Sequence, residues 1–201
     1  EVALTKGVPG SVQGLLSETR DSLQAQEADT AVFYSISNCQ AGLASISFGN
    51  SLIKQVAADL SLEVPGLKTF VTLSPIPGLA DWADEIDADT DLRALAAHYL
   101  VSAKRRDGLP LDPVARFHLG NGALIHAIHA DADLSERGQA QSFGTMVNYL
   151  YDLRRVSQNN ERFASSGKIA MSSDIRALDA AGKKILAKQN SGRASRDEPA
   201  L

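Results

Sequence analysis

The stretch AVFYSISNCQAGLASISFGNSLIKQVAADLSLEVPGLKTFVTLSPIPG, residues 31–78, has the order strand, small-residue loop, helix, strand. Residues 31–36 carry the β-branched and aromatic side chains that strands favour. Between residues 50 and 60 the apolar positions recur at helical spacing. Pro65-Gly66 ends that helix, and residues 67–73 form a second strand before a Ser-Pro-Ile-Pro-Gly turn. This order predicts an α/β fold with two parallel strands joined by a right-handed crossover.

The loop ahead of the helix, residues 41–49, consists mostly of small residues. Such a loop lets backbone N–H groups approach an anion, and the positive end of the helix dipole adds to the attraction. The pattern is neither a dinucleotide fingerprint nor a Walker loop, because Lys54 lies too far into the helix. A phosphate-bearing ligand is predicted here. The alternative is that Gly42 and Gly49 only serve turns.

Composition sets the class of protein. The 201 residues are 44% hydrophobic, with a formal net charge of −4 and a pI near 5.5. One sizeable core is expected, and the acidic balance argues against a nucleic-acid binder. The single cysteine, Cys39, permits no internal disulfide and is interpreted as a strand-end residue rather than a nucleophile. The chain opens at Glu1 with neither Met nor a signal peptide, so we expect that upstream residues have been removed.

The remaining sequence predicts one domain over residues 1–190, with a helical insertion at about 80–108 and a disordered tail at 191–201. The other expected elements are a strand at 2–5, a helix capped by Ser11 and reaching Leu23, strands at 124–128 and 142–151, and a closing helix at 169–186.

Three segments together resemble the catalytic domain of the malonyl-CoA decarboxylase family. They are residues 33–38 with the loop and helix that follow, TLSPIPG at 72–78, and PVARFHLGNGA at 113–123. MVNY at 146–149 is also similar to that family. The resemblance implies a GNAT-like fold, a mixed twisted sheet flanked by helices in which the acetyltransferase architecture is reused for decarboxylation. In the family an all-helical domain normally precedes it.

The resemblance also implies roles for particular residues. The family's catalytic serine corresponds to Ser74 and its catalytic histidine to His118. The coenzyme A pyrophosphate loop corresponds to Ala44, Ser45, Ile46, Ser47, Phe48, Gly49 and Asn50. It implies no cofactor, since the coenzyme A thioester is the substrate, and it implies a homo-oligomer, a tetramer in the family. The region between Ser74 and His118 is shorter than in the animal enzymes, and the end at Leu201 lacks a peroxisomal Ser-Lys-Leu, which suggests a bacterial-type cytoplasmic enzyme.

The chemistry of decarboxylation suits these side chains. Ser74 on a rigid Ser-Pro-x-Pro turn can hold a malonyl carboxylate, and backbone N–H groups at the end of the 31–36 strand can stabilise an enolate. An imidazole titrates near neutrality, so His118 is the expected proton donor. We therefore predict that the polar atoms of Ser74 and His118 lie about 3 to 6 Å apart.

Other interpretations of the same residues stay open at this stage. A serine before proline is ordinarily a turn former, and His98, His126 and His129 compete with His118. His126 and His129, expected on opposite strand faces, could form a metal site with Asp131 or Asp133, and the carboxylates of 81–91 could form another. The basic cluster 104–106 suits either a helix end or an anionic partner.

Three functions fit the sequence. The first is a carboxy-lyase that converts malonyl-CoA to acetyl-CoA and carbon dioxide. The second is an acyl-CoA transferase of the kind that the GNAT fold usually supports. The third is a catalytically silent acyl-CoA-binding or assembly module.

Overall fold

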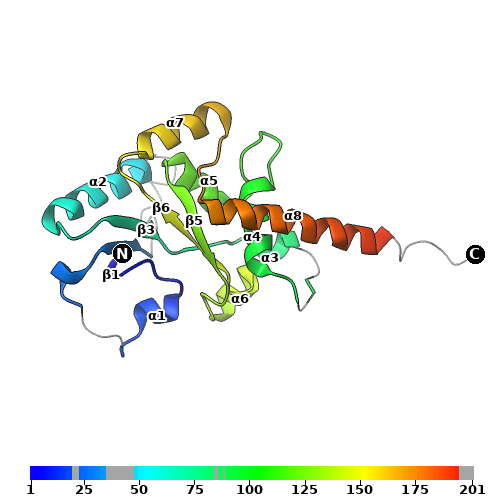
Figure 1. Cartoon of the computed structure of the whole chain (residues 1–201), viewed down its shortest axis with the longest axis horizontal. Coiled ribbons are helices and arrows are strands. Elements are labelled where there is room, and N and C mark those ends of the chain that lie inside the picture. Colours follow the sequence, from blue (N-terminus) through cyan, green and yellow to red (C-terminus); the bar gives the residue numbers. More distant parts are fainter. Residues whose placement is uncertain (20–22, 35–47, 84–85, 88, 195–201) are drawn as a thin grey trace, which may run out of the picture.

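The computed structural model describes residues 1–19, 23–34, 48–83, 86–87 and 89–194. Six strands of the described chain form one mixed sheet, in which β1, β2, β3 and β6 are neighbours and both β4 and β5 pair with β6 (Figure 1). β2 and β3 are parallel and all other pairs are antiparallel. The parallel pair expected from the β-α-β segment is confirmed. The strands are β1 Val2–Thr5, β2 Thr30–Phe33, β3 Thr69–Thr72, β4 Ser74–Pro75, β5 Leu124–His129 and β6 Met146–Leu150.

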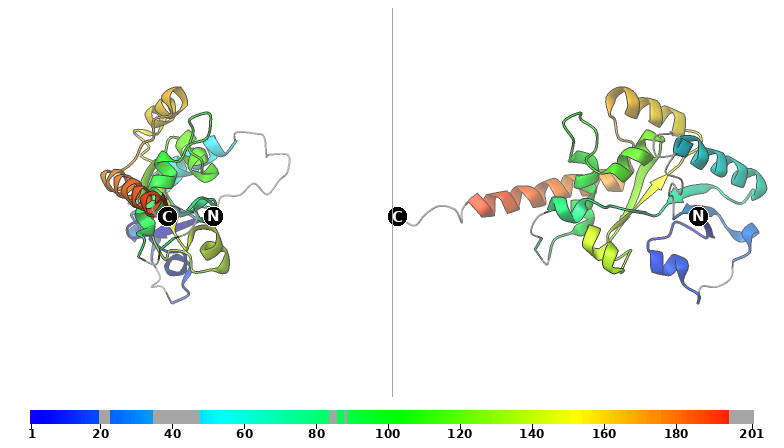
Figure 2. Two further views of the ribbon diagram at one scale, coloured as in Figure 1. Left: turned by 90° about the vertical axis from the view of Figure 1, so that its right-hand side faces the viewer. Right: turned by 180° about the vertical axis from the view of Figure 1, so that it is seen from behind.

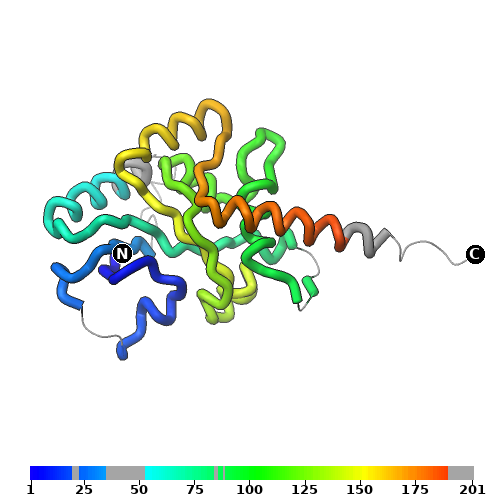
Figure 3. The backbone as a smooth tube through the Cα atoms, in the orientation of Figure 1, coloured from blue at the N-terminus to red at the C-terminus, as the bar shows by residue number. Residues whose placement is uncertain are grey.

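Helices surround this sheet. They are α1 Val12–Leu16, the short 3-10 helix η1 Ala25–Glu27, α2 Phe48–Glu63, α3 Leu79–Ala83, α4 Leu92–Ser102, α5 Pro113–Gly120, α6 Glu136–Ser142, α7 Val156–Ser166 and α8 Ser173–Ala194. α8 packs along α4, and its C-terminal half projects away from the body of the protein (Figures 2 and 3). In the part of the chain that the structure describes, no helix has the length and apolar character needed to cross a membrane.

The sheet separates two hydrophobic clusters, as the two-residue period of a strand requires. In β2, Ala31 and Phe33 join the larger cluster, while Val32 between them joins the smaller one. The larger cluster also receives residues from α2, α4, α5, α7 and α8, and the smaller one is covered by α1. Tyr149 and Tyr151, two residues apart on and just after β6, belong to the larger cluster. That side of the sheet is therefore the one that α5 covers.

Two expected elements end or begin elsewhere than predicted. The helix capped by Ser11 ends at Leu16 and does not reach Leu23, because Ser17 at its C-terminus turns into extended backbone. The strand expected from residue 142 begins at Met146. The preceding segment forms α6, which Ser135 caps by accepting from the Gly138 N–H, and left-handed backbone at Phe143 ends it.

The closing helix also differs from its expected range of 169–186. Residues 169–171 do not join the helix, because they lie along β5, where Ile125 N donates to Ala170 O and Ser172 N donates to Ile125 O. α8 then continues through Ala194, past residue 190 where we expected the tail to begin. Alanine, lysine and glutamine near that end favour helix. Residues 195–201 lie outside the described part.

Gly122, just after α5, is a position where only glycine fits. Its φ of +84° is left-handed, and a Cβ there would lie 1.9 Å from the carbonyl oxygen of Val156 in α7. Gly108 has a similar φ of +79° with nothing within 4 Å of the added atom. The comparison of these two glycines therefore separates backbone strain from close packing.

We expect Gly122→Ala to lower the free energy of unfolding by about 3 kcal/mol or more, since strain and overlap add. Gly108→Ala should lower it by only about 1 to 2 kcal/mol, the cost of left-handed backbone alone. Urea denaturation measures both. Equal losses in the two variants would contradict the close approach of α5 and α7.

Candidate active site

Ser74 lies where the strand that runs from β3 into β4 crosses β6. Val71 pairs with Leu150 and Ser74 pairs with Val147, and these two pairs share one register. Thr72 therefore lies opposite Tyr149, and the Tyr149 N–H donates to the Thr72 hydroxyl at 3.2 Å. Pro75 has no N–H to extend the ladder. Ser74 is 5% exposed, so its hydroxyl is held in the protein interior.

His118 lies in the last turn of α5. Asp112 caps this helix by accepting from the Ala115 N–H at 2.7 Å, and Pro113 occupies its first turn, a position that suits proline. The imidazole is 3% exposed and its Nε2 is 3.3 Å from the Ser74 hydroxyl oxygen. The predicted distance between the two side chains is thus confirmed. Their catalytic roles stay a prediction.

Two tyrosines complete the surroundings of His118. The Tyr151 hydroxyl is 2.8 Å from Nδ1, and the ring of Tyr149 stacks on the imidazole with centroids 4.4 Å apart and planes 20° apart. Phe117 meets the imidazole edge-on at 5.0 Å. The ring of His118 is therefore fixed by a polar atom at each nitrogen and by an aromatic face.

The direction of the hydrogen bonds determines the tautomer of His118. The Ser74 hydroxyl donates to the Thr72 hydroxyl oxygen at 2.8 Å, so its only proton is engaged there. Nε2 of His118 is then the donor to Ser74, and Nδ1 accepts from the Tyr151 hydroxyl. The site presents an N–H of a neutral imidazole toward Ser74.

Burial controls the ionisation of this group. It lowers the pKa of His118 to about 3, so the imidazole is neutral at physiological pH. The expectation of a pKa near neutrality is wrong for this arrangement, because burial is not offset by an opposite charge from the residues that the structure describes. Burial likewise raises the pKa of Tyr151 and of Tyr149, which keeps both hydroxyls protonated.

Asp112 is a buried charged residue that the sequence did not single out. It is 0% exposed, and burial raises its pKa to about 6. Among the described residues its Oδ2 has no hydrogen-bond partner. Its charge, after burial, also contributes to the raised pKa of Tyr149, whose hydroxyl has no hydrogen-bond partner in the described part of the chain. The pair Asp112-Pro113 is a helix-start signal, and it could have located α5 in advance.

The ionisations of His118 and Asp112 affect stability with opposite signs. The folded-state pKa of His118 lies below its ordinary 6.5, so its contribution is present above that value and is lost as pH falls toward 3. The folded-state pKa of Asp112 lies above its ordinary 3.8, so its contribution is present below that value and is lost as pH rises through 6. Between about pH 3.8 and pH 6 the two contributions change in opposite directions, so they largely cancel in the wild type.

Substituting His118 or Asp112 should therefore change the pH dependence of the free energy of unfolding in opposite directions. From about pH 7 to about pH 5, His118→Asn should gain roughly 2 kcal/mol of unfolding free energy relative to wild type, and Asp112→Asn should lose about 1 kcal/mol. Urea denaturation at each pH is the measurement. A difference from wild type that does not vary with pH would contradict the buried neutral imidazole or the raised carboxyl pKa.

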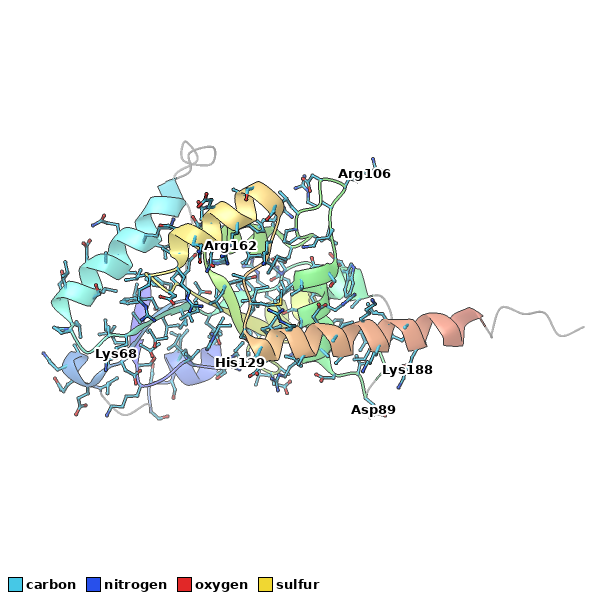
Figure 4. All side chains as sticks on the ribbon, turned by 45° about the horizontal axis from the view of Figure 1, so that its top comes forward. Lys68, Asp89, Arg106, His129, Arg162 and Lys188 are labelled. Carbon is cyan, nitrogen blue, oxygen red and sulfur yellow. The ribbon has the colours of Figure 1, made fainter. Side chains whose placement is uncertain are left out.

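The three other histidines serve different contacts. Nδ1 of His98 lies 2.8 Å from Asp179 and so ties α4 to α8. Nε2 of His129 lies 2.6 Å from the Asn148 Oδ1, and Figure 4 shows His129 beside the N-terminal segment. A bulge in β5 between Ile125 and Ala127 breaks the alternation. The opposite faces expected for His126 and His129 assumed a regular strand, so that expectation stays a prediction. Burial lowers the pKa of His126, and the charge of His129 lowers it further.

Asn148 links His129 and the N-terminal segment to the strand that carries Ser74. Its Nδ2 donates to Thr72 O at 2.8 Å and to Pro9 O at 3.3 Å. Asn148 is fully buried. Neither this residue nor Thr72, Tyr149 or Tyr151 was expected near the pair.

Several other sequence-based expectations fall partly or wholly outside the described residues. Ala44, Ser45, Ile46, Ser47 and Cys39 lie outside them, whereas Phe48, Gly49 and Asn50 form the first turn of α2. Of the expected oxyanion donors, the Tyr34 N–H donates to Glu1 O, and residues 35 and 36 lie outside the described part.

The two acidic groupings and the basic cluster can also be located. No group of three or more His, Cys, Asp or Glu residues suited to a metal ion occurs among the described residues. In the 81–91 run, Asp91 caps α4. The basic cluster 104–106 lies beyond the end of α4, where Arg105 pairs with Asp107 and Arg106 points outward (Figure 4).

The order of strands and helices has a counterpart among solved structures. The GphF GNAT-like decarboxylase, solved in complex with isobutyryl-CoA, is 21% identical, with a TM-score of 0.52 over 76% of this chain and 70% of that chain. The fold is therefore GNAT-like, as the resemblance implied.

Closer relatives specify the family. The profile of the malonyl-CoA decarboxylase C-terminal domain matches residues 1–91 and 87–194. Crystal structures of malonyl-CoA decarboxylase from Rhodopseudomonas palustris (44% identity, TM-score 0.81) and Agrobacterium vitis (42%, 0.82) cover 88% and 89% of this chain and 48% and 52% of theirs. The mitochondrial malonyl-CoA decarboxylase of Mus musculus is 32% identical over 88% of this chain and 46% of its own length. The chain belongs to the malonyl-CoA decarboxylase C-terminal domain family and spans about half the length of these relatives.

Proposed function

We propose that this protein is a carboxy-lyase that converts malonyl-CoA to acetyl-CoA and carbon dioxide. The observation that carries the proposal is the buried pair of Ser74 and His118, 3.3 Å apart, in a chain of this family. The names of the relatives support the substrate. The geometry supports a site that supplies hydrogen bonds and one proton.

The reaction requires charge to move from the malonyl carboxylate onto the thioester as the C–C bond breaks. Ser74 holds the carboxylate out of the carbonyl plane, and the Ser-Pro-Ile-Pro turn limits its freedom. Loss of carbon dioxide leaves an acetyl-CoA enolate, whose α-carbon takes the Nε2 proton of the His118 imidazolium and leaves a neutral imidazole. One proton from solvent then restores the imidazolium, so the reaction consumes one proton overall.

The low pKa of His118 fits this scheme when the substrate's own charge is considered. A carboxylate beside a buried imidazole favours the charged form and raises its pKa. Tyr151, hydrogen-bonded to Nδ1, orients the ring and tolerates either charge state because its hydroxyl can donate or accept. The imidazole therefore becomes an acid in the complex with substrate, where the proton is needed.

Coenzyme A is proposed to bind with its pyrophosphate on residues 44–50, where α2 begins. Replacing Gly49 with valine should weaken coenzyme A binding by tenfold or more, roughly, because a branched side chain would keep the anion from the backbone N–H groups. Titration calorimetry with coenzyme A measures this, and Lys54→Ala is the control with one charge removed from the same helix. Equal affinities of Gly49→Val and wild type would remove the loop from the site.

The decisive assay is incubation with malonyl-CoA and no acceptor. Acetyl-CoA and carbon dioxide form in equal amounts if the proposal is right. Release of product only when an amine or other acceptor is added would favour an acyl-CoA transferase. Binding of malonyl-CoA without turnover would favour a silent acyl-CoA-binding module.

The proposal also includes the finer expectations from the resemblance. These are a cytoplasmic location, no cofactor beyond the thioester substrate, and assembly as a tetramer. Light scattering of the purified protein tests the assembly, and turnover after exhaustive dialysis against a chelator tests the absence of a metal requirement.

A further inference from the structure

Thr72 contacts the surroundings of Ser74 through its hydroxyl and its carbonyl. Its hydroxyl oxygen accepts from the Ser74 hydroxyl at 2.8 Å and from the Tyr149 N–H at 3.2 Å, and its carbonyl accepts from Asn148 Nδ2 at 2.8 Å. The residue is completely buried. In a regular ladder the strand N–H groups donate to backbone carbonyls, whereas here the Tyr149 N–H donates to a side-chain hydroxyl.

From this geometry we propose that Thr72 is a positioning residue, which holds the Ser74 oxygen in the rotamer that the decarboxylation requires. The inference rests on the proposed function. Thr72 does not touch the reacting atoms, because Ser74 lies between it and His118.

The fixed acceptor has a specific consequence for Ser74. While its proton is donated to Thr72, the Ser74 oxygen directs lone pairs at Nε2 of His118. When a malonyl carboxylate arrives, the O–H turns from Thr72 to the carboxylate and the oxygen itself stays in place. The substrate thus replaces a weak neutral acceptor with a charged one, and the interaction is strengthened without moving the heavy atom.

Three substitutions test this role. Thr72→Val removes the hydroxyl at nearly constant volume, Thr72→Ser retains it, and Thr30→Val is the matched control. Thr30 is also a buried strand threonine whose hydroxyl makes a hydrogen bond, at 2.7 Å to Asp29, away from the site. Thr72→Val should lower kcat about tenfold with little change in KM, the effect expected from losing one neutral hydrogen bond. Thr72→Ser should restore most of kcat, and Thr30→Val should leave kcat unchanged.

A double-mutant cycle separates positioning from general damage to the fold. In the Ser74→Ala background Thr72→Val should lower kcat no further, because the hydroxyl that it positions is already gone. An equal loss in both backgrounds, or a Thr72→Ser variant as slow as Thr72→Val, would overturn the inference.

Crystal structures of Thr72→Val and Thr72→Ser provide a readout that does not depend on turnover. Ser74 should leave its rotamer in the first and keep it in the second, and an unchanged rotamer in Thr72→Val would refute the role of Thr72. If the wild type releases no carbon dioxide from malonyl-CoA while the rotamer shifts as expected, the proposed function fails and the positioning contact stands. If the wild type is active and neither kcat nor the rotamer responds, only the inference about Thr72 fails.

Discussion

Ser74→Ala should lower the kcat of malonyl-CoA decarboxylation by about 10² or more while KM changes little. The hydroxyl holds the carboxylate out of the carbonyl plane, the orientation from which the C–C bond breaks, so its loss slows that step more than it weakens substrate binding. The substitution also leaves the Nε2–H of His118 without its acceptor at 3.3 Å. Steady-state kinetics with release of carbon dioxide as the signal measures the effect.

Ser142→Ala is the matched control for this experiment. Ser142 is 2% exposed and its hydroxyl donates to the carbonyls of Gly138 and Thr145, so the substitution removes a buried serine hydroxyl outside the site. It should reduce stability and leave kcat near the wild-type value. A Ser74→Ala enzyme with normal kcat, or one with a higher KM and normal kcat, would show that Ser74 does not act in the step that breaks the C–C bond.

His118→Asn should lower kcat by about 10² to 10⁴, since water can replace the proton donor only in part. In the wild type kcat should fall as pH rises through the pKa that His118 has in the substrate complex, because the acid form is then lost. The asparagine variant should lack this transition. The profile of kcat reports the complex, whereas kcat/KM reports the free enzyme, in which burial lowers the pKa of His118 to about 3.

His126→Asn is the control for the second experiment and also tests the strongest competing histidine of the sequence. His126 lies on β5 at the bulge and is partly exposed. It should retain wild-type kcat and the same pH profile. Near-normal turnover of a folded His118→Asn variant, together with a defect in His126→Asn, would indicate that His126 on β5 is the acid and that His118 on α5 is not.

The sequence predicts the β2-α2-β3 segment correctly because its signals are local. The strand-favouring Val32 and Phe33, the helical period after Asn50 and the Pro65-Gly66 stop each act within a few residues. The distance between Ser74 and His118 was predictable only through the family resemblance. Spacing alone does not distinguish His118 from three other histidines.

The supporting residues could not be predicted, for a different physical reason. Thr72 meets Tyr149 only because β3 and β4 pair with β6 in one register, and Tyr151 reaches His118 only because α5 crosses that face of the sheet. The register of these strands and the position of α5 on the sheet are both determined by the packing of the whole core. The pKa of His118 depends on the same burial, so its departure from neutrality had no local signal.

The contact of Asn148 with Pro9 has a practical consequence for preparing the protein, because it involves residues 1–10. Its amide joins Pro9 to the strand of Ser74, so the segment that contains Pro9 is linked to the site by hydrogen bonds. A protease that cleaves within residues 1–10 during purification should therefore reduce specific activity before it causes visible unfolding. Preparations are best compared by whether residues 1–10 are intact as well as by their purity.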